Sequence, residues 1–185
     1  MNSNLLNLGW QFIHSADNLI KKKDKYIGRI SAVYKDLFSV ITGDGECRAQ
    51  MAGKQLLNDD AAVVVGDWVI LKEAGSRNLL IHERLPRKNA ISRKTSGKES
   101  REQVMVANLN YLFIVQSLDR NFNLRRLERY LVLARHSRVE PVVLLNKCDL
   151  CADYFSYIAK VRRIAPDIPV LAVSGHSGYE MDQVS

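Results

Sequence analysis

The chain has 185 residues, of which 46% are hydrophobic and 25% are charged, and this composition excludes collagen-like, coiled-coil and wholly disordered proteins. No apolar run reaches the roughly 18 residues that cross a bilayer, and polar residues interrupt the hydrophobic N-terminus, so we expect neither a membrane span nor a signal peptide. The net charge of +7 indicates an anionic partner.

Residues 1–25 are predicted to form an N-terminal extension. Leu5, Leu8, Phe12 and Ile13 have the spacing of one short amphipathic helix. We expect this helix to pack on the outside of the domain that follows.

Residues 26–83 are predicted to form a small β-barrel. Short apolar segments alternate with turns, of which Gly43-Asp44-Gly45 is the clearest. The first of five predicted strands begins at Tyr26, and the others include residues 38–42, 47–51, 68–71 and 78–83. This number and spacing are typical of an OB-like barrel, although an SH3-like barrel has a similar pattern. OB-like barrels often bind oligonucleotides, but a fold alone does not establish a function.

Three aromatic residues of this segment have the chemistry to stack on nucleic-acid bases, namely Tyr34, Phe38 and Trp68. Large aromatic side chains also supply much of the buried area in small cores. We therefore expect all three to be core residues.

Residues 84–103 are predicted to be a basic linker, mobile or partly ordered, because they show no clear hydrophobic period and contain Pro86 and Gly97. Six of the seven net positive charges lie in residues 84–101. The linker is either a solvated connector or an arm that contacts RNA phosphates, since clustered cations displace counterions from RNA. The candidate RNA-binding residues are Arg84, Arg87, Lys88, Arg93, Lys94, Lys98 and Arg101.

Residues 104–185 are predicted to form a partial α/β sheet of Rossmann-like type. The apolar run 111–115 is typical of a strand covered on both faces. Helical spacing of apolar residues follows, with Asn123 as a candidate helix cap, and two further strands are predicted at 141–145 and 169–173. The strand–helix order implies parallel strands, whose ligands bind beyond the carboxyl ends. The fold class is therefore α+β, with two domains.

Two of these strand ends carry polar motifs. The second strand runs into Asn146-Lys147-Cys148-Asp149, and the third runs into Ser174-Gly175-His176. The N-K-x-D sequence resembles the guanine-specificity box of P-loop GTPases, and S-G-H resembles their second base-contacting loop. The alternative is an ordinary Rossmann-like loop in which the aspartate caps a helix.

The chemistry of guanine explains these residue types. Guanine presents two adjacent N–H donors, which one carboxylate accepts, and a buried Asp149 would reject adenine because its charge would stay unsatisfied. The resemblance assigns the guanine carbonyl oxygen to the backbone N–H of Gly175 and places the stem of Lys147 along the base. It further implies that Asn146 joins the two loops and that Ser174 braces the turn.

Three cysteines, Cys47, Cys148 and Cys151, do not make a disulfide framework, so a reducing cytoplasm is the expected compartment. The Cys148-x-x-Cys151 pair lacks the further ligands that a structural zinc site needs. A redox pair would normally open a helix after a strand. We interpret both cysteines as buried and inert thiols.

The order of parts resembles one family. In an ordinary GTPase the phosphate-binding loop, G-x-x-x-x-G-K-[ST], precedes N-K-x-D, but residues 1–145 contain no such loop and form a barrel and a basic linker instead. This arrangement resembles the circularly permuted GTPases of the RsgA (YjeQ/YloQ) family, with Glu180 standing where the family often has a glycine. Further similar segments are Leu8-Gly9-Trp10, Val65-Gly66-Asp67-Trp68-Val69, Glu83-Arg84, Asn89-x-Ile91-Ser92-Arg93 and Ala107-Asn108-Leu109-Asn110.

The resemblance implies a factor for late maturation of the small (30S) ribosomal subunit. Its OB domain and linker would contact 16S rRNA, its permuted domain would hydrolyse GTP to GDP with Mg²⁺, and a C-terminal domain would bind zinc. Residues 104–185 would be the N-terminal half of the GTPase domain. Neither a membrane nor DNA is an expected partner.

The chain ends at Ser185, before the position where the family has its phosphate-binding loop, metal ligands and zinc domain. We therefore expect no catalytic residue and no metal ligand in this chain, with very weak GTP binding or none and no hydrolysis. The alternative reading is an RNA-binding OB module with an α/β appendage that does not bind nucleotides.

Overall fold

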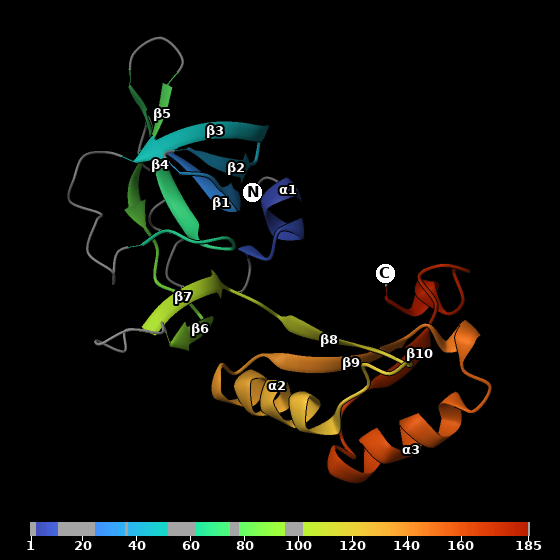
Figure 1. Ribbon diagram of the computed structural model, residues 1–185. Helices are drawn as coiled ribbons and strands as arrows, with labels where there is room; N and C mark the ends of the chain where they lie inside the picture. The colour runs from blue at the N-terminus through green and yellow to red at the C-terminus, as the bar shows by residue number, and fades with distance from the viewer. Residues whose placement is uncertain are drawn as a thin grey trace. The chain divides into compact units, whose positions relative to one another are not determined.

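The computed structural model describes residues 3–10, 25–35, 37–51, 62–74, 78–94 and 102–184 (Figure 1). The chain divides into two compact units, Met1–Leu109 and Asn110–Ser185. The division falls after Leu109, whereas the sequence placed the start of the second domain at residue 104.

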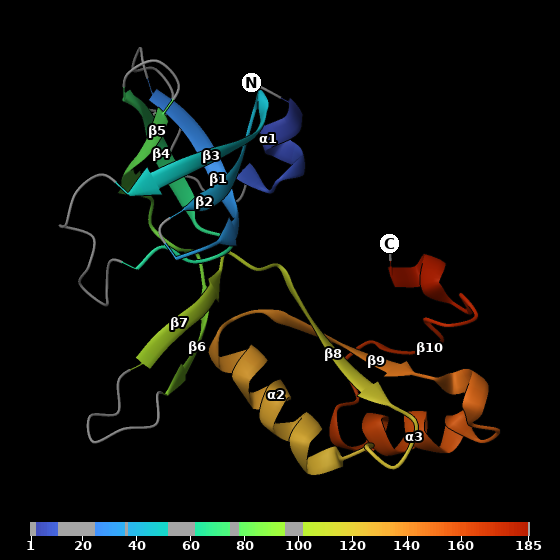
Figure 2. The same ribbon diagram turned by 45° about the horizontal axis from the view of Figure 1, so that its top comes forward.

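The first unit contains a closed five-stranded barrel with the strand order β1-β2-β3-β5-β4 (Figure 2). Neighbouring strands are antiparallel except for the parallel pair β3 and β5. This arrangement confirms the OB-like prediction. The strands are β1 (Lys25–Val33), β2 (Phe38–Thr42), β3 (Gly45–Met51), β4 (Trp68–Ala74) and β5 (Asn78–Arg84).

Alternation along the strands explains the barrel core. On β3, for example, Ala49 is buried while Arg48 and Gln50 are exposed, because successive side chains of a strand point to opposite faces. Phe38 lies in the core as predicted, but Tyr34 does not: it is 57% exposed, since it lies beyond the end of β1 in the connection to β2. The buried core comprises Ile30, Phe38, Val40, Ala49, Val63, Val69, Leu71 and Ile81.

A second apolar cluster joins the N-terminal helix α1 (Ser3–Asn7) to the barrel. The indole rings of Trp10 and Trp68 meet edge to face, with 4.8 Å between their centroids. Leu5 and Leu8 pack against this cluster, as predicted for the helix. The other two residues of the predicted helical face, Phe12 and Ile13, lie outside the described residues.

Part of the predicted linker is a β-hairpin, which corrects our interpretation of it. Strand β6 (Ala90–Lys94) pairs antiparallel with β7 (Glu102–Ala107). Val106 of β7 also forms a parallel bridge with Val65 of the barrel unit. The sequence showed no period here because the hairpin has few apolar residues, on two separate strands that only tertiary contacts bring together.

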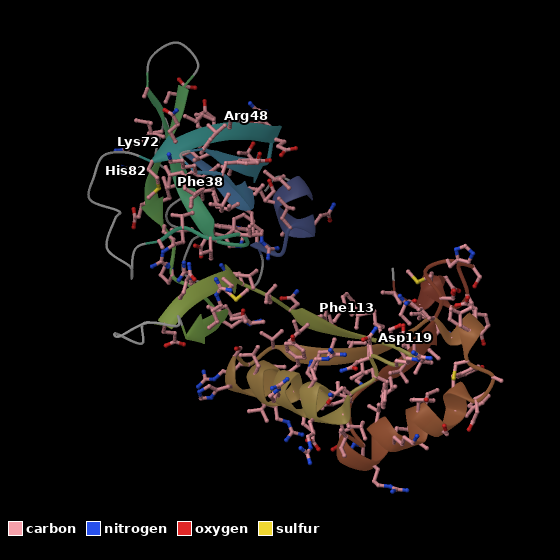
Figure 3. All side chains as sticks on the ribbon, viewed as in Figure 1. Phe38, Arg48, Lys72, His82, Phe113 and Asp119 are labelled. Atoms are coloured by element: carbon pink, nitrogen blue, oxygen red, sulfur yellow. The ribbon has the colours of Figure 1, made fainter. Side chains whose placement is uncertain are left out.

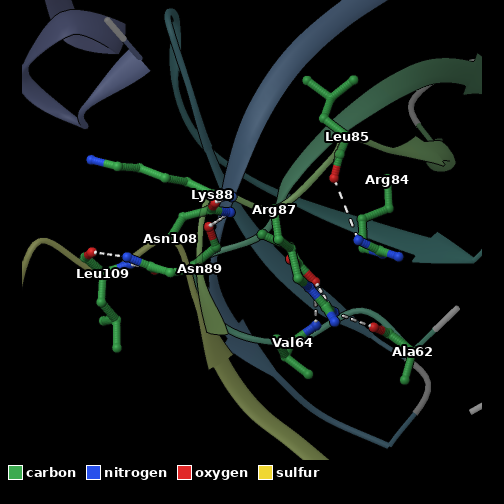
Figure 4. A network of polar contacts seen from close by, with 11 residues as sticks. Ala62, Val64, Arg84, Leu85, Arg87, Lys88, Asn89, Asn108 and Leu109 are labelled. Carbon is green, nitrogen blue, oxygen red and sulfur yellow. Dashed lines mark hydrogen bonds and ion pairs between the residues drawn. The ribbon is translucent and has the colours of Figure 1, made fainter. Parts of the chain in front are cut away.

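A buried ion pair holds the entry to this hairpin against the barrel (Figure 4). The side chain of Asp67 is fully buried, and its two carboxylate oxygens accept from Nε and Nη2 of Arg87 at 2.7 and 2.8 Å. The backbone N–H of Val64 donates to the same carboxylate at 2.9 Å. A buried charge with a bidentate partner and a further donor is well satisfied.

Asparagine side chains hold the exit of the hairpin. Asn108 has a φ of 54°, and its side chain accepts from the backbone N–H of Lys88 at 2.9 Å and donates to the carbonyl of Gly66 at 3.0 Å. The side chain of Asn89 donates to the carbonyl of Leu109 and accepts from its N–H, at 2.7 and 2.8 Å. Both ends of the hairpin are therefore held by side-chain hydrogen bonds to backbone groups.

The second unit is a three-stranded parallel sheet with the order β10-β9-β8, as predicted. Both helices lie on the same side of the sheet (Figures 1 and 2). None of the helices among the described residues is long and apolar enough to span a membrane. The elements are β8 (Tyr111–Ser117), α2 (Leu124–His136), β9 (Glu140–Asn146), η4 (Cys148–Leu150), α3 (Tyr154–Ile164), β10 (Val170–Val173) and η5 (Met181–Val184).

The two faces of β8 differ. Leu112 and Ile114 join the core formed with the helices, whereas Tyr111, Phe113 and Val115 are exposed. The apolar run had predicted a strand covered on both faces, but the described residues cover only one. At the start of α2, the Asn123 side chain accepts from the Arg126 N–H at 3.0 Å, which confirms the predicted cap.

We predict that Gly66→Ala destabilises the first unit by about 2–5 kcal/mol, because strain and overpacking add. Gly66 has a φ of +88°, and a Cβ atom there would lie 2.0 Å from the carbonyl oxygen of Ala107. Urea unfolding followed by tryptophan fluorescence measures the change, since both tryptophans, Trp10 and Trp68, lie in this unit.

Gly45→Ala is the matched control, because Gly45 has a φ of +121° but open space around its Cβ position. Strain alone should cost it about 1 kcal/mol. Equal losses in the two variants would contradict the close approach of Gly66 to Ala107.

Candidate functional site

Three strand ends meet at one edge of the sheet in the second unit. Asn146, the last residue of β9, is in register with Ser117 of β8 and with Val173 of β10. The two motifs that the sequence singled out therefore follow adjacent parallel strands. Ligands of parallel sheets bind at such an edge.

Asn146 is at the centre of this edge. Its side-chain oxygen accepts from the backbone N–H groups of Lys147 at 2.8 Å and Gly175 at 3.1 Å, and its carbonyl accepts from Leu118 N–H at 2.8 Å. One side chain thus joins the two loops, as we expected for this residue. The N–H of Gly175, which the resemblance assigned to guanine, donates to Asn146 in this structure.

Ser174 closes the second loop. It is fully buried, its hydroxyl accepts from the N–H of Ser177 at 3.1 Å, and its N–H donates to the carbonyl of Tyr179 at 3.1 Å. A hydrogen bond to Tyr154 on α3 raises the pKa of the Tyr179 hydroxyl to about 12. His176 lies in this loop and is exposed. The loop contacts Asn146 of β9 through Gly175 and Tyr154 of α3 through Tyr179.

Asp149 lies in the short helix η4 and is exposed, whereas the sequence argument took it to be buried. It does not cap the following helix α3: Asp153 does so, with its side chain accepting from the N–H of Ser156 at 3.2 Å. The helix-capping alternative therefore does not account for Asp149. Asp149 follows β9 closely, at the edge where the strands end.

Glu180 lies in a left-handed conformation. Its φ is 54°, in the region that favours glycine. A glycine would adopt this conformation without strain. Glu180 is the position at which the sequence differs from the glycine that the family often has. Gly178, two residues earlier, has a φ of +79° and open space around it.

Asp119 is a site residue that the sequence argument missed. Its carboxylate pairs with Nζ of Lys147 at 2.9 Å, and it also accepts from the Ser117 hydroxyl at 2.9 Å and the Asn121 N–H at 2.8 Å. The Asn121 N–H, followed by Lys147 and Ser117, holds the pKa of the Asp119 carboxyl well below its usual range. Its position two residues after β8, at the edge where the three strands end, is the signal that could have found it (Figure 3).

Both cysteines beside this edge contact the hydrophobic core of the second unit. Cys148 is buried in the core of the second unit, Cys151 packs against that core, and burial raises the pKa of the Cys148 thiol. The predicted burial is therefore confirmed for Cys148, whereas Cys151 is half-buried. Among the described residues, no group of three or more His, Cys, Asp or Glu side chains could hold a metal ion.

The basic residues of the predicted linker have different environments. Arg87 forms the buried ion pair with Asp67, while Lys88 and Arg93 are exposed. Arg84 is half-buried and donates to the carbonyl of Leu85 at 3.4 Å. The side chain of Lys94 and the whole of Lys98 and Arg101 lie outside the described residues.

The barrel carries exposed basic side chains of its own. Arg48 on β3 and His82 on β5 are exposed, and Lys72 on β4 is half-buried (Figure 3). The sequence did not indicate these residues as RNA-binding candidates, because they are single polar residues in alternating strands with no local cluster of charge. In the barrel order β5 lies between β3 and β4, so the three residues are on adjacent strands.

Comparison with known proteins shows the family of this chain. The family model described as RsgA GTPase matches residues 84–185. This chain belongs to the RsgA GTPase family. Small ribosomal subunit biogenesis GTPase RsgA 2 of Lactiplantibacillus plantarum is 34% identical over 187 residues, which cover 100% of this chain and 53% of the relative. The RsgA of Methanosarcina acetivorans is 39% identical over 158 residues, covering 84% of this chain and 42% of the relative.

Solved structures show the same fold as this RsgA-family chain. The crystal structure of YjeQ from Thermotoga maritima has a TM-score of 0.68 at 20% identity, covering 86% of this chain and 55% of that one. YloQ, titled a circularly permuted GTPase, has a TM-score of 0.59 at 20% identity, with coverages of 82% and 52%. The chain spans about half the length of the curated relatives it matches.

We predict that Asp119 of this RsgA-family chain stays ionised well below the ordinary aspartate value of 3.8. Because its folded-state pKa is lowered, the Lys147–Asp119 pair stabilises the fold above the ordinary value and is lost only as the pH falls through the lowered one. Side-chain carboxyl NMR across an acid titration measures this.

The Lys147→Met variant is the internal control. Its Asp119 should titrate at a higher pH than in the parent chain, but still below the ordinary value, because the Asn121 N–H remains the main cause. An unshifted titration of Asp119 in the parent chain would contradict the geometry.

Proposed function

We propose that this chain is the RNA-contacting and guanine-recognising part of a GTPase that acts in late maturation of the small (30S) ribosomal subunit, in the cytoplasm. The observation that carries the proposal is the Asn146 side chain, which joins the N-K-x-D loop to the S-G-H loop. The relatives' names support the ribosomal part, since they describe small ribosomal subunit biogenesis GTPases.

In this proposal Asp149 recognises guanine. Its exposed carboxylate accepts from the ring N–H and the exocyclic amine, and these charge-assisted bonds replace its contact with water. Adenine offers no such pair of donors, so binding it would desolvate the carboxylate without compensation. The Lys147 stem lies along the base, and the carbonyl of guanine faces the S-G-H loop, in which the Gly175 N–H donates to Asn146.

GTP hydrolysis with Mg²⁺ belongs in this proposal to the longer protein. Residues 1–185 contain no G-x-x-x-x-G-K-[ST] sequence, and the described residues offer no group that fits Mg²⁺ or zinc. Most affinity for GTP comes from backbone N–H groups and a metal ion around its phosphates. The 185-residue chain by itself should therefore bind GTP very weakly and leave it unhydrolysed.

The first unit supplies the proposed contact with 16S rRNA. Lys88 and Arg93 are exposed on and beside the β6–β7 hairpin, and Arg48 and His82 are exposed on the barrel. The buried pair of Asp67 with Arg87 holds the hairpin in place, so its cations meet RNA from a fixed backbone. A fixed arm binds at a lower entropic cost than a mobile one.

We predict that Asp149→Asn reverses base preference. The amide of asparagine donates to the additional carbonyl of xanthine, and the loss of the charged acceptor lowers affinity for GMP by about tenfold. NMR titration of this chain with GMP and with XMP measures the ratio of the two affinities.

Asp153→Asn is the matched control, because Asp153 caps α3 four residues after Asp149 and asparagine caps a helix as well as aspartate does. It should leave the ratio unchanged. An unchanged ratio in Asp149→Asn would refute the base contact and favour an RNA-binding module whose α/β part does not bind nucleotides.

We predict a steep salt dependence for binding to 16S rRNA. About six phosphate contacts on single-stranded RNA give a log–log slope of roughly −4, and Arg93→Gln should reduce its magnitude by about 0.7. Filter binding across a salt series measures both slopes. Arg163→Gln on α3 is the control and should keep the parent slope, whereas a flat response of the parent chain would remove the RNA contact from the proposal.

A further inference from the structure

We propose that Asp119 is a positioning residue for guanine recognition, which it serves by holding the Lys147 side chain in place beside the base. The inference rests on the proposed function, because it concerns the same edge of the sheet. Asp119 lies outside both motifs, 28 residues before Lys147 in the chain.

The Asp119 carboxylate is oriented before Lys147 reaches it. One oxygen accepts from the Asn121 N–H at 2.8 Å, and the other accepts from the Ser117 hydroxyl at 2.9 Å and from Lys147 Nζ at 2.9 Å. Two of the three donors are local, one at the end of β8 and one in the connection that follows it. The carboxylate therefore has its direction whether or not the lysine is present.

The connection that carries Asp119 is fixed in turn by a buried glutamine. Gln116 is 1% exposed, and its side chain accepts from the N–H of Asn123 at 3.1 Å and donates to the carbonyl of Asn123 at 3.3 Å. Asn123 also caps α2. The chain between Gln116 and Asn123 is thus held at both ends, with Asp119 at its middle.

Lys147 is held at its backbone as well. Its φ of 65° is left-handed, its N–H donates to Asn146, and its carbonyl accepts from the N–H of Leu150 at 3.1 Å. With the backbone and Nζ both fixed, the aliphatic stem between them has few conformations left. A base that packs on this stem then binds without ordering a long side chain.

This pair differs from an ordinary surface ion pair. Exposed pairs contribute little because two flexible side chains must be ordered together. Here Lys147 is 48% and Asp119 is 32% exposed, but only the lysine remains to be ordered, since Ser117 and Asn121 already hold the carboxylate. A carboxylate would also repel the phosphates of a nucleotide, so Asp119 acts through Lys147 and not by touching the ligand.

Asp119→Asn in the full 185-residue chain tests this inference, because asparagine removes the charge and keeps one acceptor oxygen for the Asn121 N–H, while its amide group can donate to the Ser117 hydroxyl oxygen. Two readouts are measured: the NMR order of the Lys147 ε-methylene group without nucleotide, and titrations with GMP and XMP. We expect a more mobile Lys147 and an affinity for GMP lower by about two- to fivefold. The ratio of GMP to XMP affinity should not change, since Asp149 sets it.

Three further variants make the test specific. Asp119→Glu should restore part of the affinity, and Asp167→Asn, beyond the far end of α3, should have no effect. In a Lys147→Met background, Asp119→Asn should cost nothing further, because its route to the base is gone.

The outcomes separate this inference from the proposed function. Unchanged Lys147 order, an unchanged GMP affinity, or an equal loss in the Lys147→Met background each overturns the inference alone. If no form of the chain binds GMP, the guanine proposal fails and the inference fails with it. If Asp149→Asn changes the base ratio while Asp119→Asn changes nothing, guanine recognition stands without a role for Asp119.

Discussion

The candidate site depends on one side-chain oxygen. Parallel pairing brings the carboxyl ends of β8, β9 and β10 to the same edge, but it does not join the loops that leave them. The oxygen of Asn146 does so, because it accepts from N–H groups of both Lys147 and Gly175. The position of each loop is therefore set relative to the other.

The first unit shows how a strongly basic segment can be structural in part. Arg87 has the charge of an RNA-binding residue, yet it pairs with the buried carboxylate of Asp67. Removing either partner would leave a buried charge uncompensated. The same contact holds the hairpin that presents Arg93. One arginine thus stabilises the hairpin that exposes a neighbouring cation, so a substitution in this segment can change either the charge of the surface or its fold.

Three non-glycine residues with left-handed backbones stand at the ends of elements that matter for this account, namely Asn108, Lys147 and Glu180. Such conformations cost about 1–3 kcal/mol each unless the surroundings determine them. Around Asn108 and Lys147 the surroundings are visible, since side-chain and backbone hydrogen bonds hold each residue on both sides. The strain is local; the groups that offset it are distant in sequence for Asn108 but near in sequence for Lys147.

The sequence by itself determined the barrel, the parallel strands and the two motif loops, because hydrophobic period, turn residues and motif spacing are local patterns. It also determined that Asn123 caps α2, since a cap reaches only three residues. Only the tertiary structure decided that Tyr34 is exposed, that part of the linker is a hairpin, that Arg87 pairs with Asp67 and that Asp119 holds Lys147. These last contacts join residues 20 and 28 positions apart, and no local period encodes which distant group a charged side chain will meet.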